Sequence, residues 1–264
     1  MALYRFDNEG INRVPRESFT QLRISERYQL QRVLRDHVDA VSEGTLVISE
    51  EFSDWEDSRR RIDLLGIDRE GNLVVIELKR SEDGGHMDLQ AVRYAAMVSA
   101  LAFDRVISIF GKYLKATGHE ADPERLLLDH LGWDSAEDGE IGNLVKIVLV
   151  ASDFKPEITT TVLWLNDQGL DIRCVRLIPY KVGEQLLLDV QQVIPLPETA
   201  DYMVRLREKK DEERKLAGLR QQNRDFTKFT ITTSMGIYPG LAKRRAIQHV
   251  VRELISQGIH PDSI

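Results

Sequence analysis

The chain is poor in the residues that form covalent cross-links and soft-metal sites. Cys174 is its only cysteine, which excludes an intramolecular disulfide and a thiolate metal site. Its six histidines are scattered and include no pair at the His-x-x-x-His spacing of many zinc sites. Any metal ion would therefore be bound by oxygen atoms.

Long apolar runs are lacking as well. None approaches the ~18 residues of a membrane span, and residues 1–7 show none of the features of a secretory signal. With 42% hydrophobic and 30% charged residues, the composition is that of a soluble globular protein, and 264 residues suffice for one large or two modest domains. We therefore expect a cytoplasmic protein with neither a membrane partner nor a small organic cofactor.

Positive charge is outnumbered overall, with 36 lysines and arginines against 43 acids, but it is concentrated in one segment. The formal net charge of −7 argues against a nucleic-acid partner, yet residues 205–252 contain thirteen lysines and arginines against five acids. This leaves +8 in that segment and −15 in the remainder. Such asymmetry indicates a basic nucleic-acid contact surface, and it is also what a solvated charged helix would show.

The sequence pattern of residues 61–79 predicts two strands joined by a tight turn. Leu64–Ile67 and Leu73–Leu78 are rich in branched aliphatic residues, and Gly71 in the intervening turn can adopt a positive φ. Three ionisable residues fall where apolar ones would be expected. They are Asp63, Glu77 and Lys79.

The register of this hairpin brings the three residues together. A three-residue loop at 69–71 sets Asp63 opposite Glu77 and Arg61 opposite Lys79. Opposed Cβ atoms lie ~4.5–5.5 Å apart, and residues i and i+2 share a face. We therefore expect Asp63, Glu77 and Lys79 to cluster at one end of one face, with an apolar opposite face formed by Ile62, Leu64, Val74, Ile76 and Leu78.

Two carboxylates this close repel each other, so at least one pKa should rise unless a proton or a cation intervenes. A hard divalent cation such as Mg²⁺ or Mn²⁺ resolves the conflict. Lys79 could then orient or deprotonate a metal-associated water, or stabilise charge on a phosphate. The alternative is a solvated Glu-x-Lys ion pair, but Leu73–Leu78 lacks polar alternation and reads as an interior strand, where uncompensated charge is costly.

Three consecutive arginines, Arg59, Arg60 and Arg61, adjoin this acidic cluster. Three cations suit a phosphate backbone. They could equally neutralise the acids at 51–57.

A helix expected at 87–101 places Gln90 and Tyr94 on one face, four residues apart, with Arg93 beside them. The amide of Gln90 and the phenol of Tyr94 could form hydrogen bonds with a phosphate or a metal-bound water. Tyr94 could also be a half-buried packing residue, and the pattern of the helix by itself favours packing.

The remaining pattern alternates helices with strands, which predicts an α/β fold with helices on both sides of a sheet. We expect a domain at 1–197, a charged connecting helix at 198–223 and a small basic α+β module at 224–264. The module is small for an independent core, so we expect it to be truncated or completed by a partner chain. Expected helices span 26–41, 87–101, 124–131 and 241–256. A further helix, capped by Ser152 or Asp153 with Pro156 near its start, runs to about Asp167. Expected strands span 45–50, 64–67, 73–78, 143–151, 170–180, 185–190 and 226–232.

The motif Asp63, then Glu77-x-Lys79, then Gln90-x-x-x-Tyr94 resembles the PD-(D/E)xK nuclease superfamily. It is similar to the branches with a Gln-x-x-x-Tyr helix, such as RecB-type exonucleases and the mismatch endonucleases of archaea and actinobacteria. The resemblance implies a restriction-endonuclease-like αβββαβ core with a mixed central sheet flanked by helices, covering about 26–151. Ile62 stands where the family usually has proline.

The resemblance also implies roles for individual residues. Asp63 and Glu77 would hold Mg²⁺ or Mn²⁺, the Leu78 carbonyl would be a further ligand, and Lys79 would position the attacking water. Gln90 and Tyr94 would support substrate or metal. Family members often bring a glutamate from the first helix to the metal, which makes Glu26 a candidate ligand, although a carboxylate in a first helical turn is commonly there for the helix dipole.

Two functions follow as hypotheses. The first is a metal-dependent deoxyribonuclease, with endonuclease action favoured, in bacterial DNA repair, restriction or antiphage defence. The second is a catalytically silent nuclease-like fold that binds nucleic acid or a protein. A double-strand cut needs two sites, which a homodimer would supply. The residues expected to contact nucleic acid are Arg59, Arg60, Arg61, Arg80, Arg93, Lys243, Arg244 and Arg245.

Overall fold

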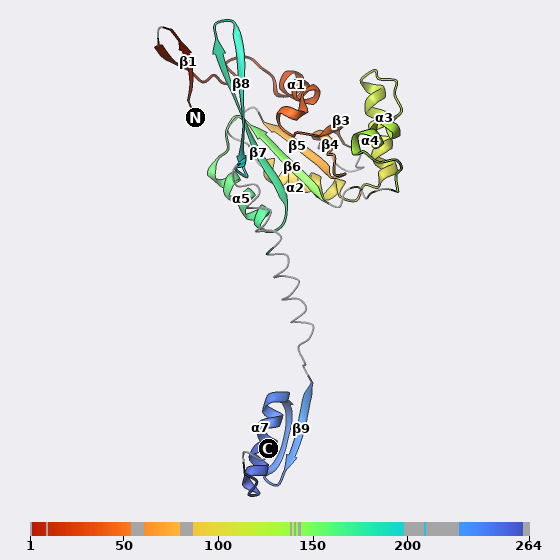
Figure 1. Cartoon of the computed structure of the whole chain (residues 1–264), viewed down its shortest axis with the longest axis vertical. Coiled ribbons are helices and arrows are strands. Elements are labelled where there is room, and N and C mark those ends of the chain that lie inside the picture. Colours follow the sequence, from red (N-terminus) through yellow and green to blue (C-terminus); the bar gives the residue numbers. More distant parts are fainter. Residues whose placement is uncertain are drawn as a thin grey trace. The chain divides into compact units, whose positions relative to one another are not determined.

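The structure, a computed structural model, describes residues 2–8, 10–53, 61–79, 87–137, 139, 141, 144–197, 209 and 227–260. The chain divides into two compact units, Met1–Val204 and Arg205–Ile264 (Figure 1). Of the expected connecting helix at 198–223, only Lys209 is described, and it is helical.

The first unit is built on a six-stranded mixed sheet with the order β3-β4-β5-β6-β7-β8. The pairs β5–β6 and β6–β7 are parallel and the other three pairs are antiparallel. This sheet confirms the expected mixed α/β architecture. The strands are β3 (Leu46–Phe52), β4 (Ile62–Ile67), β5 (Leu73–Lys79), β6 (Val145–Ala151), β7 (Asp171–Val182) and β8 (Gln185–Ile194).

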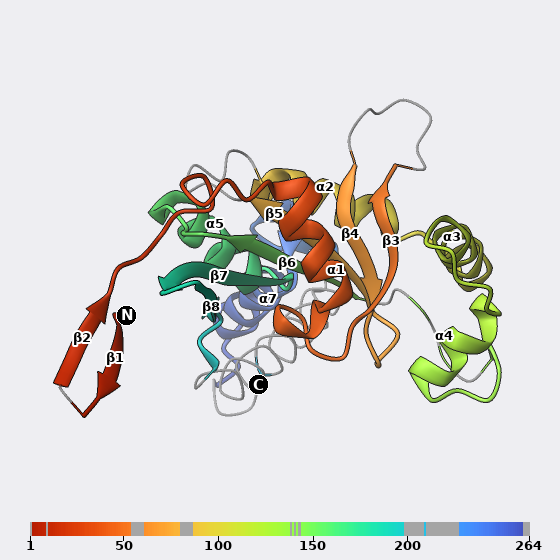
Figure 2. The same ribbon diagram turned by 90° about the horizontal axis from the view of Figure 1, so that it is seen from above.

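Helices cover both faces of this sheet, as expected. Among the described residues, a smaller core cluster lies between one face and the first helical segment, and a larger one lies between the other face and the later helices. Figure 2 shows α1 in front of the sheet and α2 behind it. The helices are η1 (Glu26–Gln31), α1 (Arg32–Asp36), η2 (Val38–Ala40), α2 (Met87–Val98), α3 (Phe103–Ala116), α4 (Pro123–Leu131) and α5 (Pro156–Asp167).

The first helical segment differs from the single helix expected at 26–41. It consists of a π-helical turn, η1, a short α-helix, α1, and a 3-10 turn, η2. The break after α1 is at His37, whose φ of −133° and ψ of 47° are not helical. A hairpin, for which the sequence predicted no strands, precedes this segment. It consists of β1 (Leu3–Asp7) and β2 (Gly10–Val14).

The β4–β5 hairpin has the predicted register. Leu64 pairs with Ile76, and the pairing continues to Ile67 with Leu73. The paired ladder ends at Leu64, so the predicted backbone opposition of Asp63 to Glu77 and of Arg61 to Lys79 is not part of it. Beyond that point the side chain of Asp63 connects the strands, because its Oδ2 accepts a hydrogen bond from the Leu78 amide at 2.7 Å.

One residue of the predicted apolar face was assigned wrongly. Leu64, Val74, Ile76 and Leu78 pack together in the cluster under α1, but Ile62 packs in the opposite cluster, under α2. At Ile62 the strand β4 has left its pairing with β5 but stays paired with β3, where Ile62 lies opposite Phe52 of the same cluster. The face of Ile62 therefore follows its packing in that cluster, which alternation along the hairpin did not predict.

The side chain of Asp68 stabilises the hairpin turn. Its Oδ1 accepts from the amides of Glu70 and Asn72, both at 2.9 Å, and its Oδ2 lies 2.6 Å from Lys146 Nζ on β6. Burial alone would raise the pKa of Asp68, but the hydrogen bonds from Lys146 and Asn72 outweigh burial and lower it. The turn and the neighbouring parallel strand are thus joined through one carboxylate.

Asp68→Ala is expected to lower the free energy of unfolding by about 2–3 kcal/mol, because it leaves buried donors of the turn and the Lys146 ammonium without their acceptor. The lowered pKa means that this stabilisation is present above the ordinary aspartate range and is lost as the pH falls, so the difference between parent and variant should shrink below pH ~4. Urea unfolding of both proteins measures this, with the exposed Asp129→Ala as the control. Equal midpoints for the parent and Asp68→Ala would contradict it.

The second unit contains β9 (Lys228–Thr233), β10 (Gly236–Ala242) and α7 (Lys243–Ser256). The sequence predicted the helix and the first strand but not β10. Pro239 lies where the ladder shifts between Tyr238 and Leu241, a position that tolerates the missing amide donor.

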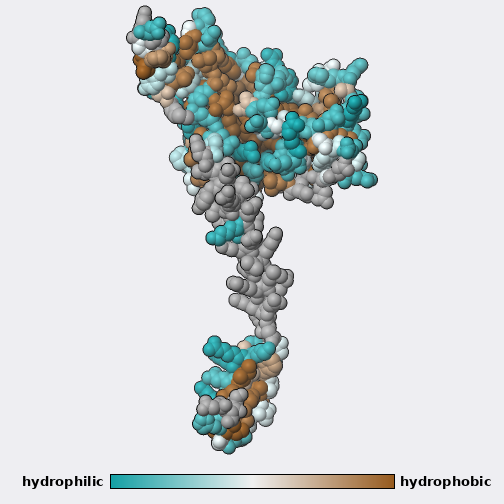
Figure 3. Space-filling model, in the orientation of Figure 1, coloured by the Kyte–Doolittle hydropathy of each residue, from teal (hydrophilic) through white to brown (hydrophobic). Residues whose placement is uncertain are grey.

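This second unit exposes much apolar surface (Figure 3). Ala246 is the only buried hydrophobic residue within the described range 227–260. A groove of about 400 Å³ runs between β9 and α7, lined mainly by Phe229, Ile231, Ile247, Val250, Val251 and Leu254. The described part of this unit therefore buries little apolar surface.

No single described helix combines the length and hydrophobicity needed to cross a bilayer. Only Met87–Val98 and Phe103–Ala116 taken together meet that criterion, and they are bent by 117° at their junction.

Candidate active site

Glu77 is the most deeply buried acidic residue of the described chain. Its exposed fraction is 0%, and it lies on β5 beside Leu149 of β6. Its Oε1 is 3.3 Å from Lys79 Nζ, whereas its Oε2 is buried without a hydrogen-bond partner. Burial, and then repulsion by the charge of Asp63, raise the pKa of Glu77.

Asp63 is the second carboxylate of the cluster. Burial raises its pKa, while the hydrogen bond from the Leu78 amide and the charge of Lys79 act in the opposite direction. Repulsion between Asp63 and Glu77 contributes to the raised pKa of Glu77, so the structure brings together the two carboxylates that the sequence placed as neighbours.

Lys79 lies between the acids of the cluster. Its Nζ is 3.3 Å from Glu77 Oε1 and 3.7 Å from Glu26 Oε1. Burial alone would lower the pKa of Lys79, but the negative charges of Glu77, Asp63 and Glu26 raise it. The ammonium is therefore protonated at neutral pH in the metal-free protein and acts as a hydrogen-bond donor and a positive charge.

Glu26 reaches this cluster from the first turn of η1. The sequence left two roles open for it, a partner of the helix dipole and a group at the metal. The ion pair with Lys79 shows that its carboxylate faces the hairpin site.

Gln90 and Tyr94 lie on α2, where Gln90 Nε2 donates to the Tyr94 hydroxyl at 3.0 Å. Tyr94 is only 2% exposed and belongs to the core cluster that also contains Val75 and Leu149. Glu77 pairs with Leu149 and is two residues from Val75, so α2 covers the face of β5 from which Glu77 projects. Tyr94 therefore packs in the core, and its helix lies over the site.

The arginines and lysines expected to contact nucleic acid are only partly described. Arg59, Arg60 and Arg80 lie outside the described residues. Arg61 and Arg93 are exposed on the first unit, and Arg61 Nη1 is 3.8 Å from Glu51 Oε2. In the second unit, exposed side chains form the first turn of α7. They are Lys243, Arg244 and Arg245.

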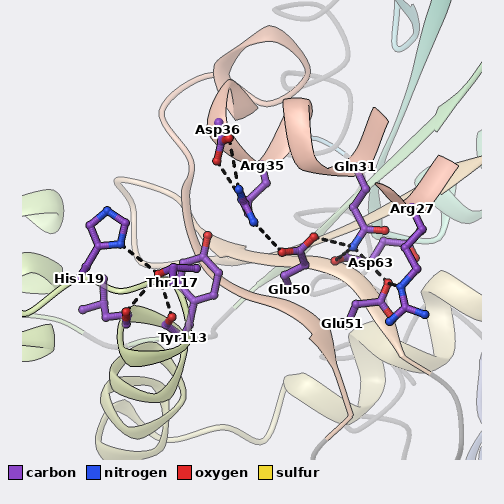
Figure 4. Close-up of polar contacts among 11 residues, drawn as sticks. Arg27, Gln31, Arg35, Asp36, Glu50, Glu51, Asp63, Tyr113, Thr117 and His119 are labelled. Carbon is purple, nitrogen blue, oxygen red and sulfur yellow. Dashed lines mark hydrogen bonds and ion pairs between the residues drawn. The ribbon is translucent and has the colours of Figure 1, made fainter. Parts of the chain in front are cut away.

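A set of polar residues beside Asp63 was not predicted from the sequence (Figure 4). Gln31 Nε2 lies 3.2 Å from Glu50 Oε1, from Glu51 Oε1 and from the backbone oxygen of Asp63. Arg27 Nε is 3.1 Å from Glu51 Oε1. The sequence hinted at this cluster only through two consecutive acids at 50–51, near the end of an expected strand. Only the fold shows that η1 faces these acids.

The donor set suits a hard divalent cation. Asp63 and Glu77 supply carboxylate oxygens, and Glu77 Oε2 is a buried acceptor that lacks a partner. A cation there would satisfy this oxygen and offset the repulsion by Asp63 that contributes to the raised pKa of Glu77. Within the described ranges, no three acidic, histidine or cysteine side chains are grouped to hold a metal ion, so a backbone oxygen such as that of Leu78 would have to complete the protein ligands.

No protein-family model and no curated protein matches the chain. Among solved structures, it is similar to a repair endonuclease from Pyrococcus abyssi, with 18% identity and a TM-score of 0.31 over 66% of this chain and 65% of the other. It is also similar to EndoMS in a complex with double-stranded DNA, with 20% identity and a TM-score of 0.28 over 56% of this chain and 43% of the other. The chain thus spans less than two thirds of either structure, and at these TM-scores neither likeness supports a conclusion about its activity.

Proposed function

We propose that this protein is a deoxyribonuclease, more specifically an endonuclease, that uses Mg²⁺ or Mn²⁺ to hydrolyse phosphodiester bonds in bacterial DNA repair, restriction or antiphage defence. The observation that carries the proposal is the buried, unpartnered Oε2 of Glu77 beside a second carboxylate and a lysine. A carboxylate oxygen buried in a protein interior without a hydrogen-bond partner is costly. A cation bound during function would explain why it is there. The motif from Asp63 to Tyr94, which resembles PD-(D/E)xK nucleases, supports the same function.

In the proposed mechanism, Asp63, Glu77 and the Leu78 carbonyl would hold the cation. When bound, it would activate a water and neutralise charge on the scissile phosphate. Lys79 would donate a hydrogen bond that orients this water or stabilises negative charge on the phosphate. Glu26 would hold the Lys79 ammonium in place, and Gln90 would line the site from α2, where it donates a hydrogen bond to the hydroxyl of the buried Tyr94.

Phosphate contacts outside the site would come from basic side chains. Arg61 and Arg93 are exposed on the unit that carries the site, and Lys243, Arg244 and Arg245 are exposed on the second unit. Their charge would favour a polyanion and make DNA binding depend on salt. Homodimerisation and a cytoplasmic location stay predictions from the sequence.

The test of the proposal is incubation of the whole chain with labelled linear, circular, mismatched and single-stranded DNA and with RNA, each in the presence of Mn²⁺, Mg²⁺ or a chelator. We expect cleavage of DNA that the chelator abolishes and that Asp63→Ala lacks. Cleavage of circular DNA would show endonuclease action. Salt-sensitive DNA binding without cleavage under any of these conditions would instead favour the catalytically silent binding module.

Lys79→Met is expected to slow DNA cleavage by at least about a hundredfold while Mn²⁺ binding is retained, because the lysine acts on water or phosphate and is not a metal ligand. Cleavage rates together with Mn²⁺ titration calorimetry separate the two effects. Lys181→Met, which changes an exposed lysine on β7, is the matched control. Loss of Mn²⁺ binding in Lys79→Met, or an unchanged rate, would contradict the assigned role.

A further inference from the structure

Gln31 is a buried polar residue with an unusual set of neighbours. It is 1% exposed, and its amide nitrogen lies 3.2 Å from Glu50 Oε1, Glu51 Oε1 and the Asp63 backbone oxygen. Figure 4 shows Gln31 reaching from η1 toward Glu50 and Glu51 of β3 and Asp63 of β4. One side chain therefore connects the first helical segment to the two strands beside the site.

The chemistry of these neighbours defines the orientation of the Gln31 amide. All three are oxygen acceptors, so the NH₂ group and not the carbonyl oxygen must face them. Its two hydrogens are shared among three acceptors. If the side chain at position 31 had no donor, the carboxylates of Glu50 and Glu51 and the backbone oxygen of Asp63 would each lose this hydrogen-bond donor. Such a loss is unfavourable where water has little access.

The π-helical turn explains how η1 reaches the site at two points. Leu30 N donates to Ser25 O at 3.1 Å, a hydrogen bond that spans five residues. Such bonding brings residues five apart into line along the helix. In an α-helix of 3.6 residues per turn, Glu26 and Gln31 would point about 140° apart. Here Glu26 faces Lys79 while Gln31 faces the Asp63 backbone.

A second observation near Gln31 is the backbone of Glu51. Its φ of 51° lies in the left-handed region, which a residue with a side chain rarely adopts. Such conformations persist where surrounding contacts hold them, and they cluster at functional sites. The carboxylate of Glu51 is held by Gln31 and, at 3.1 Å, by Arg27.

From this geometry we propose that Gln31 is a positioning residue that fixes the backbone of Asp63 and so sets the distance between the carboxylates of Asp63 and Glu77. The inference rests on the proposed function, because it assigns Gln31 a role in the cation site of that nuclease. Gln31 touches neither the substrate nor the cation. It acts through the carbonyl of Asp63, in the manner of the outer-shell partners that orient metal ligands in other proteins.

The test compares Gln31→Met with Gln29→Met in the whole chain. Both variants replace glutamine by an unbranched apolar residue in the same π-helical turn, but Gln29 is exposed and its Oε1 accepts a hydrogen bond from the local Ser25 amide. Isothermal titration with Mn²⁺ alone gives the dissociation constant, and kcat and KM are measured on DNA. We expect Gln31→Met to raise the Mn²⁺ dissociation constant about 10- to 100-fold and to lower kcat with little change in KM, whereas Gln29→Met resembles the parent.

Circular dichroism first establishes that each variant is folded. If Gln31→Met does not fold, Gln31→Asn carries the test, since it keeps the amide but is one methylene too short to serve all three acceptors. A folded Gln31 variant with the Mn²⁺ affinity and kcat of Gln29→Met would overturn the role of Gln31 while leaving the nuclease intact. A parent protein that neither binds Mn²⁺ nor cleaves DNA would overturn the proposed function, and this inference with it.

Discussion

Asp63→Asn and Glu77→Gln are each expected to lose metal-dependent DNA cleavage by at least about a hundredfold, since even outer-shell partners of metal ligands commonly contribute 10- to 100-fold. Both changes keep the size of the side chain and remove the negative charge that would hold the cation. In the structure these two groups differ in their surroundings. Asp63 accepts a hydrogen bond from Leu78, whereas Glu77 Oε2 has no partner.

Single-turnover cleavage of labelled DNA, with excess enzyme and saturating Mn²⁺, measures the loss without interference from product release. Glu43→Gln, which changes an exposed glutamate of the same unit, is the matched control and should cleave like the parent. Parent-like cleavage by either active-site variant at the same Mn²⁺ concentration would show that the carboxylates do not hold a catalytic cation.

At pH 8 without divalent cations, Glu77→Gln is expected to be more stable than the parent. The free energy of unfolding should rise by about 1–3 kcal/mol, because glutamine removes a buried charge with an unsatisfied oxygen. The ion pair with Lys79 opposes this gain, but the raised pKa of Glu77 shows that burial and the repulsion by Asp63 outweigh it. In a thermal scan the gain corresponds to about 2–4 °C per kcal/mol for a unit of this size.

The pH dependence follows from the direction of the shift. A carboxyl group whose pKa is higher in the folded protein binds more protons there than in the unfolded chain. Its contribution is therefore neutral below the ordinary glutamate range and becomes destabilising as the pH rises through the raised pKa. The advantage of Glu77→Gln should be small at pH 4 and grow toward pH 8, whereas Glu43→Gln should follow the parent.

Mn²⁺ should reverse the order of stabilities. A ligand that binds only the folded state at 100 times its dissociation constant adds about 2.7 kcal/mol. The parent should gain this stabilisation and Glu77→Gln should not. A parent that is more stable than Glu77→Gln without Mn²⁺, or a variant that gains as much from Mn²⁺ as the parent, would mean that Glu77 is satisfied by protein contacts and has no need of a cation.

Much of the first unit was predictable because its elements carry strong local patterns. The apolar runs of β5 and β6 and the turn residues around Gly71 predicted the strands and the hairpin register. The helix α5 was predicted to end at about Asp167, as it does, but its cap was expected at Ser152 or Asp153, whereas the N-cap residue is Lys155. Errors occurred where pairing or packing overrides the local pattern, as at Ile62 and at Pro239.

The site could be predicted in part because its acids stand out in an apolar strand. Asp63, Glu77 and Lys79 were recognisable without a fold, since charge between branched aliphatic residues is unusual. Gln31 was not recognisable, because a glutamine in an amphipathic helix normally faces solvent. Its burial depends on the π-helical turn and on the two strands that meet it.

The order of helices and strands, the hairpin and its three ionisable residues could be predicted from the sequence. Strand propensity, turn chemistry and the alternation of side chains depend on only a few neighbouring residues. Three features became visible only in the tertiary structure. Glu26 faces Lys79, Tyr94 is buried while its helix covers the site, and Gln31 contacts the Asp63 backbone. These contacts join residues that are far apart in the chain. They depend on how strands pair and on which face each helix covers, and no local pattern specifies either.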